Sequence, residues 1–275
     1  KLEITMKKKI QLTIAFFGIF FLMAFFSSAQ CKIENKAFKE GEKLSYDLYY
    51  KYGIINAKAG VGSLSTTLTN VAGKSAYRIK LLANTSGIVG NMYTVNDTLT
   101  GYVDANMVPL LFTKEAFEGK DYSTDRQSYS YRNGEMKIRS IRHWKGKLRF
   151  DTIFTTNKCS YDYISVLAYA RNLDYSNLKR GDNIPIQFVT GRKIVNMSIR
   201  YMGTESVKAN DGKTYDSIKL SLMILDDAFA DQQEAMNVAL TNDLNRMPLI
   251  IEIGLKIGSM RVVLKKFSGI RHPIN

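Results

Sequence analysis

Most of the chain alternates between apolar and polar residues with a period of two. In the first such segment Leu44, Tyr46, Leu48 and Tyr50 fall on one face, and the pattern recurs up to about residue 155. A period of two, rich in aromatic and β-branched residues, is typical of antiparallel strands with one half-buried face. Glycine- and asparagine-containing turns fall about every 8 to 15 residues, a spacing that favours a sandwich, a barrel or a curved sheet.

One segment departs from this alternation. Ile164, Leu167 and Ala168 share a stripe with helical spacing, which predicts a helix at about 160–175 with Ser160 or Asp162 as its N-cap. Strand-like runs then return at Ile184–Thr190, Lys193–Met202, Lys213–Leu225, Glu234–Thr241, Leu249–Lys256 and Ser259–Phe267. The predicted fold class is therefore mainly β: an antiparallel curved sheet, half-barrel or sandwich with one principal helix. No Pro-rich or Ser-rich linker interrupts the chain, so we expect a single β-rich domain over residues 41–270.

The N-terminal residues have the features of a secretory signal. Three lysines follow Met6, an apolar run extends from Ile14 to Phe26, and small residues lead up to Ala29. We expect residues 1–29 to be a signal peptide and residues 30–40 to be a mobile segment. The apolar run is shorter than the roughly 20 residues that span a bilayer, so no transmembrane span is expected after signal cleavage. This predicts an exported protein of the periplasm or the outer-membrane surface.

The chain has two cysteines and two histidines. An oxidising compartment permits a disulfide between Cys31 and Cys159, which would stabilise the fold by roughly 5 kcal/mol because it closes a long loop. Two unpaired thiols are equally compatible with the sequence, because Cys31 belongs to the segment expected to be mobile. So few cysteines and histidines leave too few ligands for a structural zinc cluster, and we expect neither a metal nor a cofactor.

The chain is basic, with 39 Lys and Arg against 25 Asp and Glu. The densest charge lies between residues 135 and 150, where odd positions carry Lys137, Arg139, His143, Lys145, Lys147 and Arg149. On a hairpin this spacing predicts one cationic face, either an anion-binding face for an anionic envelope component or a solvated outer face of the kind usual in antiparallel sheets. Export and the lack of a helix-turn-helix or RNP-like motif argue against nucleic acid as a partner.

Catalytic motifs are missing from the sequence. It contains no Gly-x-Ser-x-Gly elbow and no phosphate-binding glycine motif, and His143 and His272 offer no evident nucleophile partner. We therefore expect no enzymatic activity. The alternative is a hydrolase of envelope polysaccharide that uses paired carboxylates from Asp226, Asp227 and Asp231, and such a site needs two carboxyl groups about 5 to 10 Å apart.

Four motifs occur in a characteristic order along residues 41–267. They are Gly41-Glu42-Lys43-Leu44-Ser45-Tyr46-Asp47, Asp162-x-x-Ser165-x-Leu167-x-Tyr169-x-Arg171, Gly203-x-Glu205-x-Val207 and Asp243-x-Asn245-Arg246-x-Pro248. In this order the chain resembles an uncharacterised family of exported Gram-negative proteins, domain of unknown function 3108. The resemblance implies an exported β-rich domain and brings no known reaction or ligand. The predicted sheet is also similar to the curved sheets of periplasmic lipoprotein carriers, in which a helix covers the concave face.

Taken together, these observations predict a non-enzymatic module that binds an amphiphile or an envelope partner. Tyr46, Tyr50, Leu167 and Tyr169 are the predicted groove residues. Arg171 on the helix is expected to form a buried ion pair with Glu205 or Asp243 on the sheet, which would dock the helix. A third interpretation is a structural envelope-assembly component that works through an exposed strand edge.

Overall fold

The computed structural model describes residues 32–87, 90, 94–224, 234–255 and 258–274. The predicted signal peptide lies outside the described residues. The principal helix is α3 (Tyr163–Asn172). The strands are β1 (Lys43–Tyr52), β2 (Ile55–Val71), β3 (Lys74–Thr85), β4 (Val95–Val103), β5 (Pro109–Glu118), β6 (Asp121–Arg132), β7 (Glu135–Trp144), β8 (Lys147–Thr156), β9 (Ser160–Tyr161), β10 (Asn183–Thr190), β11 (Lys193–Lys208), β12 (Thr214–Ile224), β13 (Glu234–Thr241), β14 (Pro248–Gly254) and β15 (Ser259–Ser268).

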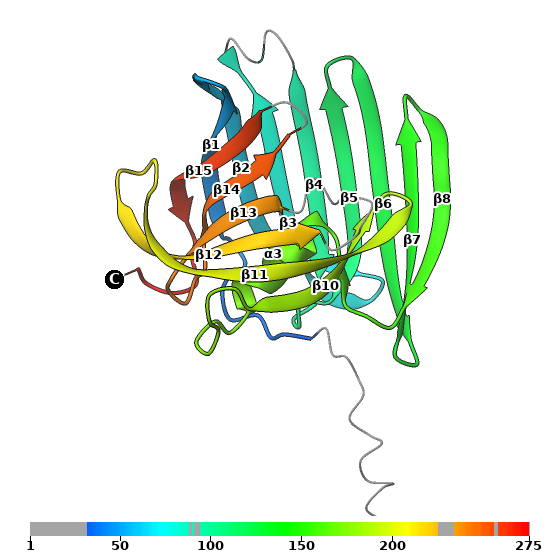
Figure 1. Cartoon of the computed structure of the whole chain (residues 1–275). Coiled ribbons are helices and arrows are strands. Elements are labelled where there is room, and N and C mark those ends of the chain that lie inside the picture. The colour runs from blue at the N-terminus through cyan, green and yellow to red at the C-terminus, as the bar shows by residue number, and fades with distance from the viewer. Residues whose placement is uncertain (1–31, 88–89, 91–93, 225–233, 256–257, 275) are drawn as a thin grey trace, which may run out of the picture. The chain divides into compact units, whose positions relative to one another are not determined.

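All of these strands belong to one 15-stranded sheet. Strands β1 to β8 form one antiparallel meander and β10 to β15 form a second, and the two are joined because β15 pairs with β1. In Figure 1 strands β10 to β13 cross in front of the β3–β8 part of the sheet, and α3 lies between the two. The mainly β fold, the curved antiparallel sheet and the principal helix confirm the sequence prediction. Among the described residues, no helix is long and apolar enough to cross a membrane.

The N-cap of helix α3 is Asp162. The carboxylate of Asp162 accepts hydrogen bonds from the backbone N–H groups of Ile164 and Ser165, both at 2.9 Å, and the Ser165 hydroxyl accepts one from the Asp162 N–H. This reciprocal capping box satisfies donors that would otherwise be orphaned at the helix start. The helix is shorter than the predicted 160–175, because Ser160 and Tyr161 pair with β10 instead.

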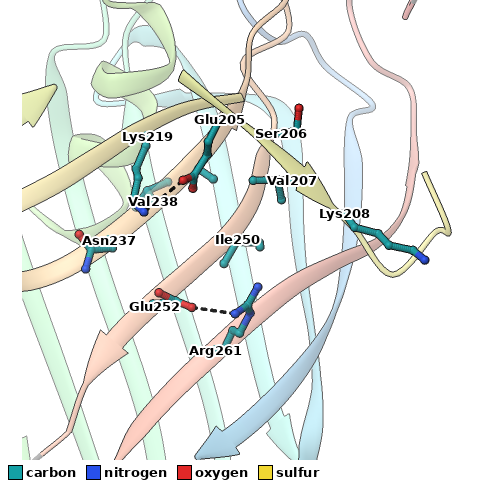
Figure 2. A pocket seen from close by; sticks show the side chains of 11 residues that line it. Glu205, Ser206, Val207, Lys208, Lys219, Asn237, Val238, Ile250, Glu252 and Arg261 are labelled. Atoms are coloured by element: carbon teal, nitrogen blue, oxygen red, sulfur yellow. Dashed lines mark hydrogen bonds and ion pairs between the residues drawn. The ribbon is translucent and has the colours of Figure 1, made fainter. Parts of the chain in front are cut away.

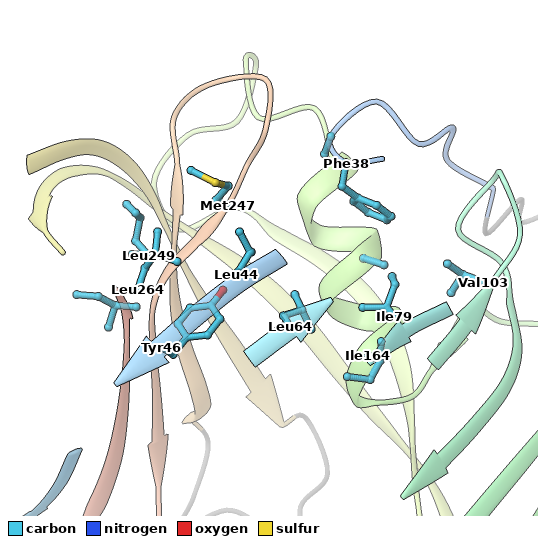
Figure 3. Packing of buried hydrophobic residues seen from close by; sticks show 14 of the residues in the cluster. Phe38, Leu44, Tyr46, Leu64, Ile79, Val103, Ile164, Met247, Leu249 and Leu264 are labelled. Carbon is cyan, nitrogen blue, oxygen red and sulfur yellow. The ribbon is translucent and has the colours of Figure 1, made fainter. Parts of the chain in front are cut away.

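The helix divides the apolar interior into two clusters. Ile164 and Ala168 belong to one cluster, and Val166 and Ala170 to the other. Figure 3 shows the first cluster, in which Ile164 lies near side chains of β1 to β4. Gly101 on β4 allows this approach, since a Cβ atom there would lie 2.5 Å from Ile164 Cγ2.

Residues 33–38 differ from the expectation of a mobile segment over 30–40. The backbone N–H groups of Ile33 and Asn35 donate to the carbonyls of Asn106 and Ala105, at 2.9 and 3.0 Å. Phe38 is fully buried in the first cluster. Its ring packs edge-on against Tyr77, 5.5 Å between centroids, so burial of one aromatic side chain holds the segment on the domain.

Candidate binding face on the inner side of the sheet

A row of side chains crosses the sheet from β2 to β7 on the face that contacts α3, which we call the inner face. Each residue of this row lies directly opposite the next in the strand register, so their side chains share one face. We call this set the inner row: Leu64, Leu81, Leu99, Lys114, Asp125 and Arg142. It is apolar from β2 to β4 and charged from β5 to β7.

The charged half of the inner row is joined by ion pairs. Arg142 Nε lies 3.7 Å from Asp125 Oδ1. Lys114 Nζ lies 3.4 Å from Asp97 Oδ2 and 3.3 Å from Glu118 Oε1. Positive and negative groups therefore alternate along this part of the face, beside the leucines of β3 and β4.

Strand alternation explains why these charges point inward. Phe112 and Gln127 lie two residues from Lys114 and Asp125 on the same strands, and both are buried. Residues two apart on a strand share a face. Tyr163, the first residue of α3, lies against this face, with its ring centroid 6.0 Å from that of Phe112. Tyr163 is nevertheless 46% exposed, so solvent reaches the inner face beside the start of the helix.

Burial shifts the pKa values of the charged groups. Desolvation by burial raises the pKa of Asp97 and of Asp125, more than their cationic neighbours lower it. Burial alone would lower the pKa of Lys114, but the carboxylates of Asp97 and Glu118 hold it above its usual value. In addition, Asp97 Oδ1 is buried and has no hydrogen-bond partner among the described residues. Clustered groups with shifted pKa values are characteristic of functional sites.

The row next to the inner row, on the side away from α3, carries mostly small side chains. On β2 and β3 Gly62 lies opposite Ala83, and on β5 and β6 Ala116 lies opposite Ser123. Asp97 on β4 lies between Ala83 and Ala116. Trp144 continues this row on β7, opposite Ser123. Ala116 and Ser123 are buried, so solvent reaches this part of the face at the charged side chains of the inner row: Lys114 is 24% and Arg142 41% exposed. A ligand there could contact these charged groups beside the part-buried Leu81 and Leu99.

The structure places the four predicted groove residues elsewhere. Tyr46 is 5% exposed and its hydroxyl donates to the Pro248 carbonyl, so it belongs to the core, as Figure 3 shows. Leu167 packs against the first cluster and Tyr169 against the second, so the two do not share a surface. Tyr50 is half-buried on β1. Tyr163 was missed, because the sequence does not show which side of the helix remains uncovered.

The basic segment does not form one cationic face as predicted. Lys137 and Arg139 lie on the outer face, and the Arg139 guanidinium pairs with Asp151. A bulge next to Arg142 and His143 shifts the register of β8, so Lys147 lies opposite Trp144 and Leu148 lies opposite His143. The bulge therefore reverses the alternation that the odd positions suggested. Lys145 and Arg149 both lie over the Trp144 ring, 4.5 and 4.3 Å from its centroid.

Arg171 forms the predicted buried ion pair, but with another partner. Its two terminal nitrogens contact the two carboxylate oxygens of Glu42, each at 2.7 Å, and the side chains are 2% and 1% exposed. The predicted pairing with Glu205 or Asp243 was wrong. Glu205 pairs with Lys219 at the surface, 3.2 Å away. Asp243 instead accepts hydrogen bonds from the backbone of its own loop.

Glu205 lines a pocket of about 360 Å³ on strands β11 to β15, shown in Figure 2. Val207, Val238 and Ile250 provide its apolar surface. Two ion pairs flank it, Lys219 with Glu205 and Arg261 with Glu252, and all four side chains are 41–48% exposed. Lys114 and Asp125 on the inner face are more buried, 24% and 16% exposed, and exposed pairs contribute little, so this pocket is a weaker candidate than the inner face.

Four of the predicted residues lie outside the described part of the chain. Asp226, Asp227 and Asp231, the carboxylates of the hydrolase alternative, lie outside the described residues, as does Cys31. The pairing of Cys31 with Cys159 thus stays a prediction, although the described part of the chain contains no free cysteine. Within that part, no group of His, Cys, Asp and Glu side chains is arranged to hold a metal ion.

The family model described as "Protein of unknown function (DUF3108)" matches residues 45–265. The chain belongs to this family. Among solved structures, this DUF3108 protein is similar to a beta-barrel-like protein of domain of unknown function DUF1849 from Brucella abortus, with a TM-score of 0.56 and 12% identity over 86% of this chain and 100% of the other. That similarity concerns the fold alone.

A candidate exported protein with a YmcC-like fold from Bacteroides fragilis also matches, with a TM-score of 0.35 and 9% identity over 86% of this chain and 99% of the other. No curated protein matches the sequence. The chain thus shares its family with proteins of unknown function and its fold with a beta-barrel-like protein.

Proposed function

We propose that this DUF3108 protein is exported and binds an amphiphile on the inner row, without catalysing a reaction. The observation that carries the proposal is that the part-exposed stretch of the inner row, from Leu81 to Arg142, is divided into leucines and alternating charges. An acyl chain lying along Leu81 and Leu99 would bring its head group to Lys114, Asp125 and Arg142. Pockets with an apolar lining and a few convergent polar groups are typical of small-molecule sites.

The charges favour a zwitterionic head group. Lys114 and Arg142 alternate with Asp97 and Asp125, so a single anion would meet repulsion as well as attraction. A head group with both a phosphate and an amine would complement both signs.

Calorimetric titration with dodecylphosphocholine, below its critical micelle concentration, tests the proposal. We expect saturable binding of one detergent molecule per chain, and no binding of glycerophosphocholine, which lacks the acyl chain. Arg142→Gln should weaken binding by about 10- to 100-fold, since a hydrogen bond to a charged group is worth about 1.5 to 3 kcal/mol.

Arg126→Gln is the matched control, because Arg126 is exposed on the neighbouring strand and the opposite face. Absence of saturable binding would refute the proposal, as would equal losses in the two arginine variants. Thermal unfolding of both variants establishes that they are folded.

The sheet edge supports a second candidate, assembly with another envelope chain through strand pairing. β8 is the terminal strand of the sheet, and Ile153 on it is 53% exposed. Unpaired edge strands are ready templates for pairing. Sedimentation equilibrium tests this for self-association: an oligomer that Ile153→Lys dissociates would support the edge, and a monomer at all concentrations would argue against pairing between copies.

A further inference from the structure

The hairpin tips at one end of the β1–β8 meander differ from those at the other end. In a meander, alternate turns lie at the same end, and Figure 1 shows the β1–β2, β5–β6 and β7–β8 turns together at the top. The opposite turns are Ala72-Gly73 between β2 and β3, residues 104–108 between β4 and β5, where the apolar Met107 and Val108 are buried, and Asn133-Gly134 between β6 and β7. The top turns combine lysine with exposed apolar side chains. We call the exposed residues of these turns the tip surface: Lys51, Tyr52, Ile54, Phe117, Lys120, Tyr122, Lys147 and Leu148.

The β1–β2 tip carries Lys51, Tyr52 and Ile54. Ile54 is fully exposed and Tyr52 is 55% exposed. Ordinary surface leucines and isoleucines need no explanation one at a time. A fully exposed isoleucine at the tip of a turn, next to an exposed aromatic residue and a lysine, instead indicates an interaction surface.

The other two tips repeat the combination. Phe117 and Tyr122 lie directly opposite each other across the β5–β6 turn, are 43% and 44% exposed, and flank Lys120. At the β7–β8 turn, Leu148 is 58% exposed and follows Lys147. Three separate turns thus present apolar groups beside ammonium groups at one end of the sheet.

The charge at these tips is positive. Asp121 already pairs with Lys145, 2.6 Å apart, and Glu118 pairs with Lys114. Lys51, Lys120 and Lys147 are exposed, and among the described residues no ion pair engages them. The whole chain carries a formal net charge of +14.

We infer that the tip surface docks on an anionic lipid bilayer. At the lipid–water boundary, aromatic and aliphatic side chains insert among the acyl chains while lysines meet the phosphates. The apolar residues lie on separate tips with lysines between them, a distribution that suits a planar boundary better than one packed protein interface. The inference concerns a different surface from the inner row and does not rest on the proposed function.

The single tryptophan provides a direct probe, since Trp144 precedes the β7–β8 turn. We expect the protein from Gln30 onward, without the predicted signal peptide, to sediment with vesicles of phosphatidylethanolamine and phosphatidylglycerol, and its fluorescence to be quenched by brominated acyl chains in them. Vesicles of phosphatidylcholine alone should leave it in the supernatant. Added salt should release it, because salt screens the attraction.

Paired variants localise the contact. Lys147→Glu should weaken vesicle partition by at least about fivefold, the contribution of one basic residue at such a surface. Ile54→Asp should also weaken it. The controls are Lys74→Glu and Leu244→Asp, which change exposed residues away from these tips. Neither control should change partition.

The outcomes separate this inference from the proposed function. Sedimentation with anionic vesicles that falls in the two tip variants and not in the controls supports docking, whether or not the inner row binds detergent. No sedimentation with anionic vesicles, or equal loss in tip and control variants, overturns it. Lipid found with protein in the supernatant, without sedimentation, also overturns docking and supports the inner-row proposal instead.

Discussion

Replacing Arg171 by methionine should destabilise the domain more than any exposed substitution. The variant keeps an unbranched side chain of similar length and leaves the Glu42 carboxylate buried, 1% exposed, without its ion-pair partner. It also removes the hydrogen bond that Arg171 donates to the Asn245 carbonyl at 2.9 Å. One change therefore affects the helix, the start of β1 and the β13–β14 loop.

The size of the effect follows from burial. Breaking a buried ion pair by removing one partner costs about 3 to 5 kcal/mol, because an uncompensated charge remains in a low-dielectric interior. For a domain of this size each kcal/mol lowers Tm by about 2 to 4 °C, so we expect a fall of roughly 6 to 20 °C. Urea unfolding at neutral pH measures the free energy directly.

The double variant Glu42→Gln/Arg171→Met tests the reasoning. Since no charge is then left buried, its stability should return to within about 2 kcal/mol of the parent. Within the described part of the chain Arg171 Nε is buried without a hydrogen-bond partner, so the native pair is not fully satisfied and its net contribution is small. A loss below about 1 kcal/mol in Arg171→Met, or a double variant whose loss equals the sum of the single losses, would refute this account.

Three further changes have defined outcomes. Gly101→Ala should cost about 1 to 3 kcal/mol in urea unfolding, because the new Cβ would lie 2.5 Å from Ile164 Cγ2; unchanged stability would mean that α3 shifts freely. Asp162→Ala removes the N-cap and should cost about 1 to 2 kcal/mol by the same assay, with reduced helical circular dichroism. Burial alone would raise the pKa of Asp47, but hydrogen bonding and pairing with Lys58 hold it below the ordinary 3.8. Its stabilisation is then present above that value and lost as pH falls through the lower folded-state pKa, so the stability gap between Asp47→Asn and the parent should close in acid; a constant gap from pH 7 downward would contradict the pairing.

Local patterns predicted the strands and the helix because each depends on neighbouring residues. β13 occupies Glu234–Thr241 as predicted, and Asp162 was one of the two expected N-caps. The helix was predicted too long at its start. The apolar spacing of the segment does not show that Ser160 and Tyr161 pair with β10 and so lie outside α3. The family followed from the order of motifs that are individually unspecific.

Long-range features could not be read in this way. Arg171 and Glu42 are 129 residues apart, and sequence alone did not favour Glu42 over the other acidic candidates. The bulge that moves Lys147 to the side of Trp144 depends on the pairing of β7 with β8. The inner row likewise exists only through register, because Lys114 and Arg142 belong to strands that are otherwise unremarkable in composition.

The pairing of β1 with β15 has a consequence for biogenesis. Lys43 lies opposite Ser268, so this edge of β1 stays unpaired until β15 has been made. A chain that emerges N-terminus first cannot form this pairing before β15 has emerged, and contacts this distant in sequence form slowly. Deleting β15 should therefore leave unpaired strand edges on β1 and β14. Because such edges pair with other chains, we expect the product to aggregate rather than to form a smaller soluble domain.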